Sequence, residues 1–135
     1  MGPWPSGIGA VTLFVEDLAA AKRFYQEVFG LPVVFEDDDA VAYTFGNTIV
    51  NLLKTTAAPE LIEPATVAGR EAGSRLVLTI DVHDVDAVCA ELASRGAELL
   101  NGPMDRPWGV RTASFRDPGG HIWEVAQELS RADGP

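Results

Sequence analysis

The chain has 135 residues, 47% of them hydrophobic and 22% charged, which is the balance of a single globular domain. Twenty acidic residues against ten basic ones give a net charge of −10, which repels phosphate backbones and argues against a nucleic-acid partner. No apolar run approaches the roughly 20 residues that span a bilayer. The single cysteine excludes an internal disulfide framework, and the N-terminus lacks the basic start and apolar stretch of a signal peptide. We therefore expect a cytoplasmic protein that binds no membrane.

The first half of the chain has the pattern of a strand, a helix and three further strands. Residues 9–15 are rich in β-branched and aromatic side chains, and Asp17 follows them as a helix N-cap. Apolar side chains then recur at helical spacing over 18–29, and Gly30 stands where a helix end favours positive φ. Turn residues separate three short predicted strands, at 32–36, 40–46 and 48–54.

Residues 55–74 have the composition of a linker, with two prolines and many small side chains, and have room for one helical turn. The second half then repeats the order of the first. A strand at 75–82 precedes Asp84, which is a second helix N-cap, and the helix ends before Gly96. Three predicted strands complete this half, at 97–100, 109–115 and 121–127.

The repeat determines the fold that we predict. "FVEDL" at 14–18 aligns with "DVHDV" at 81–85, a period of about 67 residues. We therefore predict an α+β fold of two βαβββ modules, at 7–54 and 75–127, with a short tail at 128–135. Each sheet would pack its helix on one face and leave a curved face free to enclose a ligand. We expect a homodimer, because one chain need not cover both of these faces.

The stretch "RDPGGHIWEVAQ" at 116–127 raises the question of whether His121 and Glu124 form half of a metal site. Residues three apart in a strand point to opposite faces, whereas in a helix they could chelate together. "DPGG" has turn chemistry and follows a predicted strand, which favours a hairpin. We therefore predict that His121 and Glu124 are not a metal motif.

Three stretches resemble the vicinal oxygen chelate superfamily: "VTLFVEDLAAAKRFYQEVFGLPV", "DVDAVCAELASRGAELL" and "FRDPGGHIWEV". This superfamily includes glyoxalases, fosfomycin-resistance transferases, extradiol dioxygenases and bleomycin-resistance proteins. The resemblance covers nearly the whole chain and implies paired βαβββ modules whose curved mixed sheets surround a cavity.

Metal sites of this superfamily take one ligand from the first strand and one from the last strand of each module. Carried over residue by residue, these positions are Ala10, Asn51, Leu76 and Glu124. Only Glu124 matches the ligand pattern. Ala10 and Leu76 cannot coordinate a metal, and the amide oxygen of Asn51 is a weak ligand. The resemblance therefore disfavours a divalent metal, and we expect no cofactor.

Without a metal, the resemblance points to the bleomycin-resistance branch, whose members bind a drug at a dimer interface without chemistry. We therefore predict a protein that binds a small molecule, either a drug or a metabolite, and the net charge favours a cationic one. The alternative is a metal-dependent enzyme of the same superfamily, a glyoxalase-like lyase or isomerase or a dioxygenase. The residues leave open whether the protein is an enzyme.

Strand parity selects side chains for the cavity. Thr12 and Phe14 share a face with Ala10, and Leu78 shares a face with Leu76. An apolar cavity that also holds a hydroxyl, an amide and a carboxylate would suit a flat or partly cationic ligand. The alternative is that these side chains only pack between the modules.

Strand parity cannot place three further candidates, Tyr43, Trp108 and Arg111. Trp108 lies in a Pro- and Gly-flanked loop, where it either covers a ligand or anchors the loop or a dimer contact. Arg111 either holds a ligand carboxylate or pairs with one of the acidic residues. The full set of cavity candidates is Thr12, Phe14, Tyr43, Asn51, Leu76, Leu78, Trp108, Arg111 and Glu124.

Overall fold

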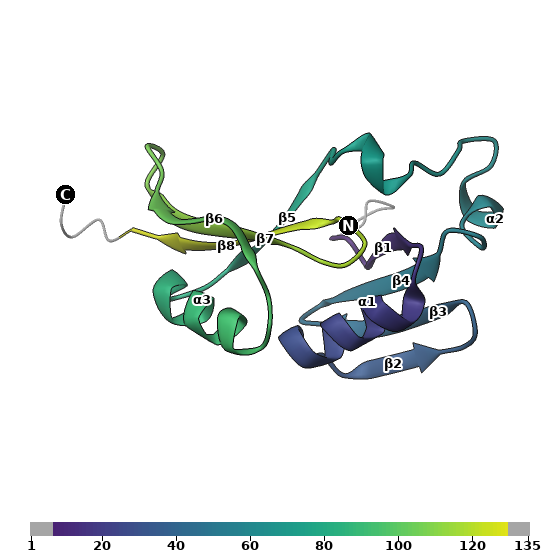
Figure 1. Ribbon diagram of the computed structural model, residues 1–135, viewed down its shortest axis with the longest axis horizontal. Coiled ribbons are helices and arrows are strands. Elements are labelled where there is room, and N and C mark those ends of the chain that lie inside the picture. The colour runs from purple at the N-terminus through teal and green to yellow at the C-terminus, as the bar shows by residue number, and fades with distance from the viewer. Residues whose placement is uncertain (1–6, 130–135) are drawn as a thin grey trace, which may run out of the picture. The chain divides into compact units, whose positions relative to one another are not determined.

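The computed structural model describes residues 7–129 and contains two modules with the same order of elements (Figure 1). The chain divides into two compact units between Arg70 and Glu71. Each unit contains a four-stranded mixed sheet, so the predicted α+β fold of two βαβββ modules is confirmed.

The first module is a sheet with strand order β1-β4-β3-β2. β1 runs parallel to β4, and the remaining neighbours are antiparallel. Helix α1 (Leu18–Phe24) follows β1 and continues into the π-helical turn η1 (Tyr25–Phe29). The strands are β1 (Ala10–Val15), β2 (Val33–Glu36), β3 (Ala40–Phe45) and β4 (Thr48–Lys54).

The residues predicted to start and end this helix do so. Oδ1 of Asp17 accepts a hydrogen bond from the backbone N–H of Ala20 at 3.0 Å and so caps α1. Gly30 ends the π-helical turn with φ 67°, a left-handed conformation that a Cβ would disfavour. The core between helix and sheet consists of buried apolar side chains: Leu13, Val15, Ala21, Tyr25, Val28, Val41, Tyr43, Val50 and Leu52.

The second module repeats this arrangement, with strand order β5-β8-β7-β6 and β5 parallel to β8. Helix α3 (Val85–Ser94) starts at Asp84, whose side chain accepts a hydrogen bond from the N–H of Ala87 at 3.1 Å. It packs on the sheet through Val85, Cys89 and Leu92. The strands are β5 (Val77–Asp81), β6 (Leu99–Asp105), β7 (Val110–Arg116) and β8 (Ile122–Glu128).

Strand β6 is longer than the sequence predicted. Its pairing with β7 shifts register between Asn101 and Met104, and Gly102 lies within this irregularity with φ 84°. A Cβ on Gly102 would lie 2.4 Å from the carbonyl oxygen of Thr112, so the close approach of the two strands requires glycine. The strand thus continues past Gly102 and Pro103, beyond the end at residue 100 that the sequence predicted.

The segment predicted as a linker contains regular structure. It holds the short helix α2 (Pro59–Ile62) and the 3-10 turn η2 (Arg70–Ala72). Ala58 is fully buried, so the start of this segment is packed onto the first module. No helix within residues 7–129 is long and apolar enough to cross a membrane.

Candidate functional site

In each module one face of the sheet packs on the helix, and the opposite face, here called the helix-free face, carries the candidate site. Burial alternates along the strands and identifies the two faces. In the first module the helix-free face carries Ala10, Thr12, Phe14, Ile49, Asn51 and Leu53. In the second module it carries Val77, Thr79, Asp81, Thr112, Ser114, Ile122, Glu124 and Ala126.

On the helix-free face of each module, a threonine of the first strand is hydrogen-bonded to a polar side chain of the last strand. In the first module, Thr12 pairs with Asn51, whose Nδ2 donates to Thr12 Oγ1 at 3.5 Å. In the second, Thr79 pairs with Glu124, and Thr79 Oγ1 donates to Glu124 Oε1 at 2.9 Å. Sequence reasoning missed Thr79, although it follows Thr12 by the 67 residues of the internal repeat.

The structure corrects the prediction for Leu76 and Leu78. Leu78 pairs with Trp123, which is buried on the helix side, so Leu78 does not share the face of Glu124. Leu76 precedes β5 and is 56% exposed. The period of 67 residues places Val77 at the position of Ala10, and a slip of one residue exchanges the two faces of a strand.

Tyr43 also lies on the helix side, which contradicts its choice as a cavity residue. It pairs with Val50, is 0% exposed and stacks on Tyr25 with ring centroids 5.9 Å apart. Its hydroxyl donates to the carbonyl oxygen of Lys22 at 3.4 Å. Burial and, second, the nearby carboxylate of Glu36 raise the pKa of Tyr43 to about 12. Tyr43 is therefore a core residue.

Arg111 pairs with acidic residues, which is one of the two alternatives that the sequence left open. Its Nη1 lies 2.9 Å from Asp105 Oδ1, and its Nη2 lies 3.0 Å from Asp86 Oδ1 at the start of α3. The hydrogen bonds that the guanidinium donates to Asp105 and Asp86 raise its pKa further above the ordinary value. Arg111 thus ties β7 to β6 and α3 on the side away from Glu124.

Trp108 lies between β6 and β7 and is 68% exposed. The guanidinium carbon of Arg106 lies 5.8 Å from the Trp108 ring centroid, and Arg106 Nε donates to Thr112 Oγ1 at 2.9 Å. Thr112 belongs to the helix-free face, so Arg106 links the indole to that face. Arg106 was not among the sequence candidates.

A pocket of about 630 Å³ opens at the end of the second module where β5 leads into α3. This volume lies in the usual range for small-molecule sites. Asp81 and Ala126 of its lining belong to the face of Glu124, whereas Gln127 lies on the helix side, where its Oε1 accepts a hydrogen bond from the N–H of Val85. The carboxylates of Asp81 and Glu128 favour a basic ligand. The pocket is lined by Asp81, Val82, His83, Val110, Ala126, Gln127 and Glu128.

His121 belongs to the turn between β7 and β8 and is bonded away from Glu124. Its Nδ1 lies 3.0 Å from Oδ2 of Asp117, and its backbone N–H donates to Asp117 Oδ1 at 2.8 Å. Asp117 is buried, so this pair fixes the hairpin that carries β8. His121 is thus a turn residue, and Glu124 is the strand residue of the stretch.

The residues at the four positions do not fit the metal centre that the resemblance implies. With Val77 in place of Leu76, the set is Ala10, Asn51, Val77 and Glu124, which contains one carboxylate. A protein site for a transition metal uses three or four strong ligands. Within either module, over the described residues 7–129, no three His, Cys, Asp or Glu side chains are grouped to hold a metal ion.

Two bacterial proteins are similar to the chain over most of its length. YraH of Bacillus subtilis (strain 168), an uncharacterized protein, is 32% identical over 124 residues, which are 88% of this chain and 96% of YraH. Metallothiol transferase FosB of Shouchella clausii (strain KSM-K16) is 30% identical over 127 residues, which are 89% of this chain and 79% of FosB.

Solved structures agree with the fold. A glyoxalase/bleomycin resistance protein/dioxygenase from Nocardioides has a TM-score of 0.84 at 22% identity, over 95% of this chain and 87% of that chain. TnmS3, an antibiotic binding protein from Streptomyces sp. CB03234, has a TM-score of 0.69 at 27% identity, over 92% and 97% of the chains. The family model matches residues 7–125, and the chain therefore belongs to the Glyoxalase/Bleomycin resistance protein/Dioxygenase superfamily.

Proposed function

We propose that this protein binds a small molecule, a drug or a metabolite, without a metal and without chemistry, in the manner of bleomycin-resistance proteins. The proposal rests on the side chains at the four positions where the superfamily has its metal ligands. These are Ala10, Asn51, Val77 and Glu124, and only Glu124 has a carboxylate. Because Glu124 alone cannot form a metal centre, its carboxylate remains available to an organic ligand.

Glu124 is the proposed anchor for the ligand on the helix-free face of the second module. The hydroxyl of Thr79 donates to Oε1 at 2.9 Å and holds the carboxylate in one orientation. Oε2, which has no hydrogen-bond partner among residues 7–129, can accept a charge-assisted hydrogen bond from a ligand N–H. Asp81 and Glu128 in the adjoining pocket, together with the net charge of −10, favour a basic ligand.

The likeness to TnmS3 supports binding without chemistry, because that relative is described as an antibiotic binding protein. We extend the proposal to a homodimer, which is the form in which the bleomycin-resistance branch binds its drugs. We also propose a cytoplasmic location, since Cys89 is a buried free thiol and suits a reducing compartment.

The second candidate function is a metal-dependent enzyme, and the observation in its favour is the 30% identity to a metallothiol transferase. A lyase, isomerase or dioxygenase of the superfamily belongs to the same alternative. Each of these requires a metal centre that Ala10 and Val77 cannot help to form.

A thermal-shift screen of the full chain against antibiotics and metabolites, with and without EDTA, separates the two functions. The proposal predicts that a basic compound raises the melting temperature equally in both conditions, because binding stabilises the folded state. Stabilisation that disappears with EDTA would favour the metal-dependent alternative. Turnover of the bound compound would contradict binding without chemistry.

A further inference from the structure

Residues 55–67 leave the first module through a series of hydrogen-bonded turns. The backbone N–H of Thr55 donates to the carbonyl oxygen of Val15 at 2.9 Å, which ties the segment to the end of β1. The N–H of Glu63 then donates to the carbonyl oxygen of Pro59 and closes α2. Because these bonds and the buried Ala58 hold the segment in place, its surface is part of the fold.

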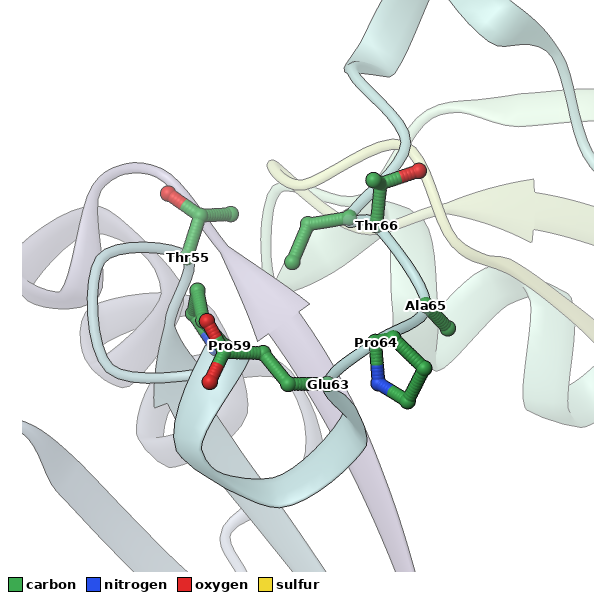
Figure 2. A pocket seen from close by; sticks show the side chains of 7 residues that line it. Thr55, Pro59, Glu63, Pro64, Ala65 and Thr66 are labelled. Carbon is green, nitrogen blue, oxygen red and sulfur yellow. The ribbon is translucent and has the colours of Figure 1, made fainter.

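These turns border a shallow, solvent-open pocket of about 670 Å³ that belongs entirely to the first unit. Figure 2 shows Thr55 and Pro59 on one side, Thr66, Ala65 and Pro64 on the other, and the side chain of Glu63 running between them toward Pro59. The volume lies in the usual range for small-molecule sites. The pocket is lined by Thr55, Pro59, Glu63, Pro64, Ala65, Thr66 and Val67.

The lining combines rigid apolar surface with one charge. The rings of Pro59 and Pro64 fix the φ angles of their backbone, so the apolar walls lose little conformational entropy when a ligand binds. Glu63 is the only ionisable residue in the lining, and the described residues provide no ion pair for it. Two threonine hydroxyls supply further acceptors.

We propose that this pocket is a second binding site, specific for a small organic ammonium ion with an apolar ring. The ammonium group would donate to the carboxylate of Glu63, while the ring covers the proline and valine side chains. The chain's net charge of −10 attracts such a cation over a longer range. The site contains no residue of the helix-free faces, so it does not depend on the function proposed above.

Benzylamine is a suitable probe, with benzyl alcohol as its neutral counterpart of the same size. The amides of ¹⁵N-labelled full-length protein are followed by NMR during titration with each compound. We expect benzylamine to shift the amides of Thr55, Thr66 and Val67 and to bind about three- to fivefold more tightly than benzyl alcohol, the scale of an ion pair exposed to water.

Two variants assign this preference to the pocket. Glu63→Gln should lower the affinity for benzylamine to that for benzyl alcohol. Glu60→Gln, in helix α2 directly before Glu63 but outside the lining, should leave it unchanged. Shifts confined to other residues, equal affinities for the two compounds, or an equal loss with Glu60→Gln would each overturn the proposal.

Discussion

Glu124 is the residue on which the proposed binding depends, and its contacts predict the effect of removing its charge. Glu124→Gln keeps the volume of the side chain and still accepts the hydrogen bond of Thr79. The fold should therefore remain intact, while affinity for a basic ligand should fall by about 1.5 kcal/mol, or roughly tenfold, the lower end for a hydrogen bond to a charged group.

Calorimetry with the best compound of the screen measures this loss, and thermal unfolding monitors the fold. Glu27→Gln, an exposed change on the π-helical turn of the first module, is the matched control and should leave affinity unaltered. Unchanged affinity in Glu124→Gln, together with a lower melting temperature, would make Glu124 a structural residue.

Tyr43 gives a prediction for the dependence of stability on pH. Its pKa is raised from 10.0 to about 12 in the fold, so between these values the unfolded chain releases a proton that the folded chain retains. The stability that this phenol contributes is therefore complete below pH 10 and is lost as pH rises toward 12. Tyr43→Phe should lose less stability than the wild type over this interval.

Urea unfolding of both proteins at pH 9 and pH 11.5 tests this difference. Other titrating residues contribute equally to the stability of both proteins, so the comparison isolates the effect of Tyr43. At pH 9 the two should agree within about 1 kcal/mol, because the hydroxyl makes one long hydrogen bond, of 3.4 Å, to Lys22. A gap between the two proteins that stays constant with pH would contradict the burial of the phenol.

At the scale of elements, the pairing of β6 with β7 predicts that alanine destabilises the protein more at Gly102 than at Gly109, although the two glycines have similar φ angles. Gly102 (φ 84°) lies against Thr112 and Ala113, whereas a Cβ added at Gly109 (φ 93°) would meet no atom within 4 Å beyond its chain neighbours. Gly109→Ala should cost about 1–2 kcal/mol for its backbone conformation alone. Gly102→Ala should cost about 2–5 kcal/mol, because overpacking is added.

Chemical denaturation of the two alanine variants measures these costs. Failure of Gly102→Ala to fold while Gly109→Ala folds normally would also agree with the expectation. Equal losses in the two variants would contradict the close approach of β6 to β7 at Gly102.

The order of elements could be predicted because local chemistry specifies it. Asp17 and Asp84 both cap helices through a side-chain oxygen, and Gly30 has the positive φ that its position suggested. These signals need only neighbouring residues, so they can be recognised without tertiary structure.

The register of β5 could not be predicted in the same way. Leu76, Val77 and Leu78 are all apolar, so neither alternation nor composition says which of them faces the helix. The pairing of Leu78 with Trp123 decides it, and that pairing spans 45 residues of sequence. The sequence therefore placed Glu124, Thr12 and Asn51 on the correct sheet faces but chose the wrong residues of β5, and that these side chains bind a ligand stays a prediction.

Tyr43 was wrongly chosen as a cavity residue, and the partner of Arg111 was left open, for a related reason. Both lie in strands that have buried side chains on both faces, and the partners Tyr25 and Asp86 come from other elements. The Tyr25 ring on the π-helical turn and the Asp86 carboxylate on α3 hold them on the helix side. Such contacts depend on how helix and sheet pack, which the sequence pattern alone does not specify.

At the scale of the whole molecule, the two modules retain the same architecture but differ in the polar group that they expose. The threonine is common to both, while the last strand supplies the amide of Asn51 in one and the carboxylate of Glu124 in the other. The second module thus carries a negative charge, on Glu124, where the first module carries the neutral Asn51. A single carboxylate suits recognition of a basic group better than coordination of a metal.

The metal content of the protein tests the central claim most directly. Protein purified without chelator is incubated with zinc, manganese, nickel or ferrous iron, desalted, and analysed by mass spectrometry of the elements. The four positions of the superfamily's metal ligands contain a single carboxylate, that of Glu124, so we expect far less than one bound ion per chain for every metal. One ion per chain, lost in Glu124→Gln, would contradict metal-free binding and establish the metal-dependent alternative.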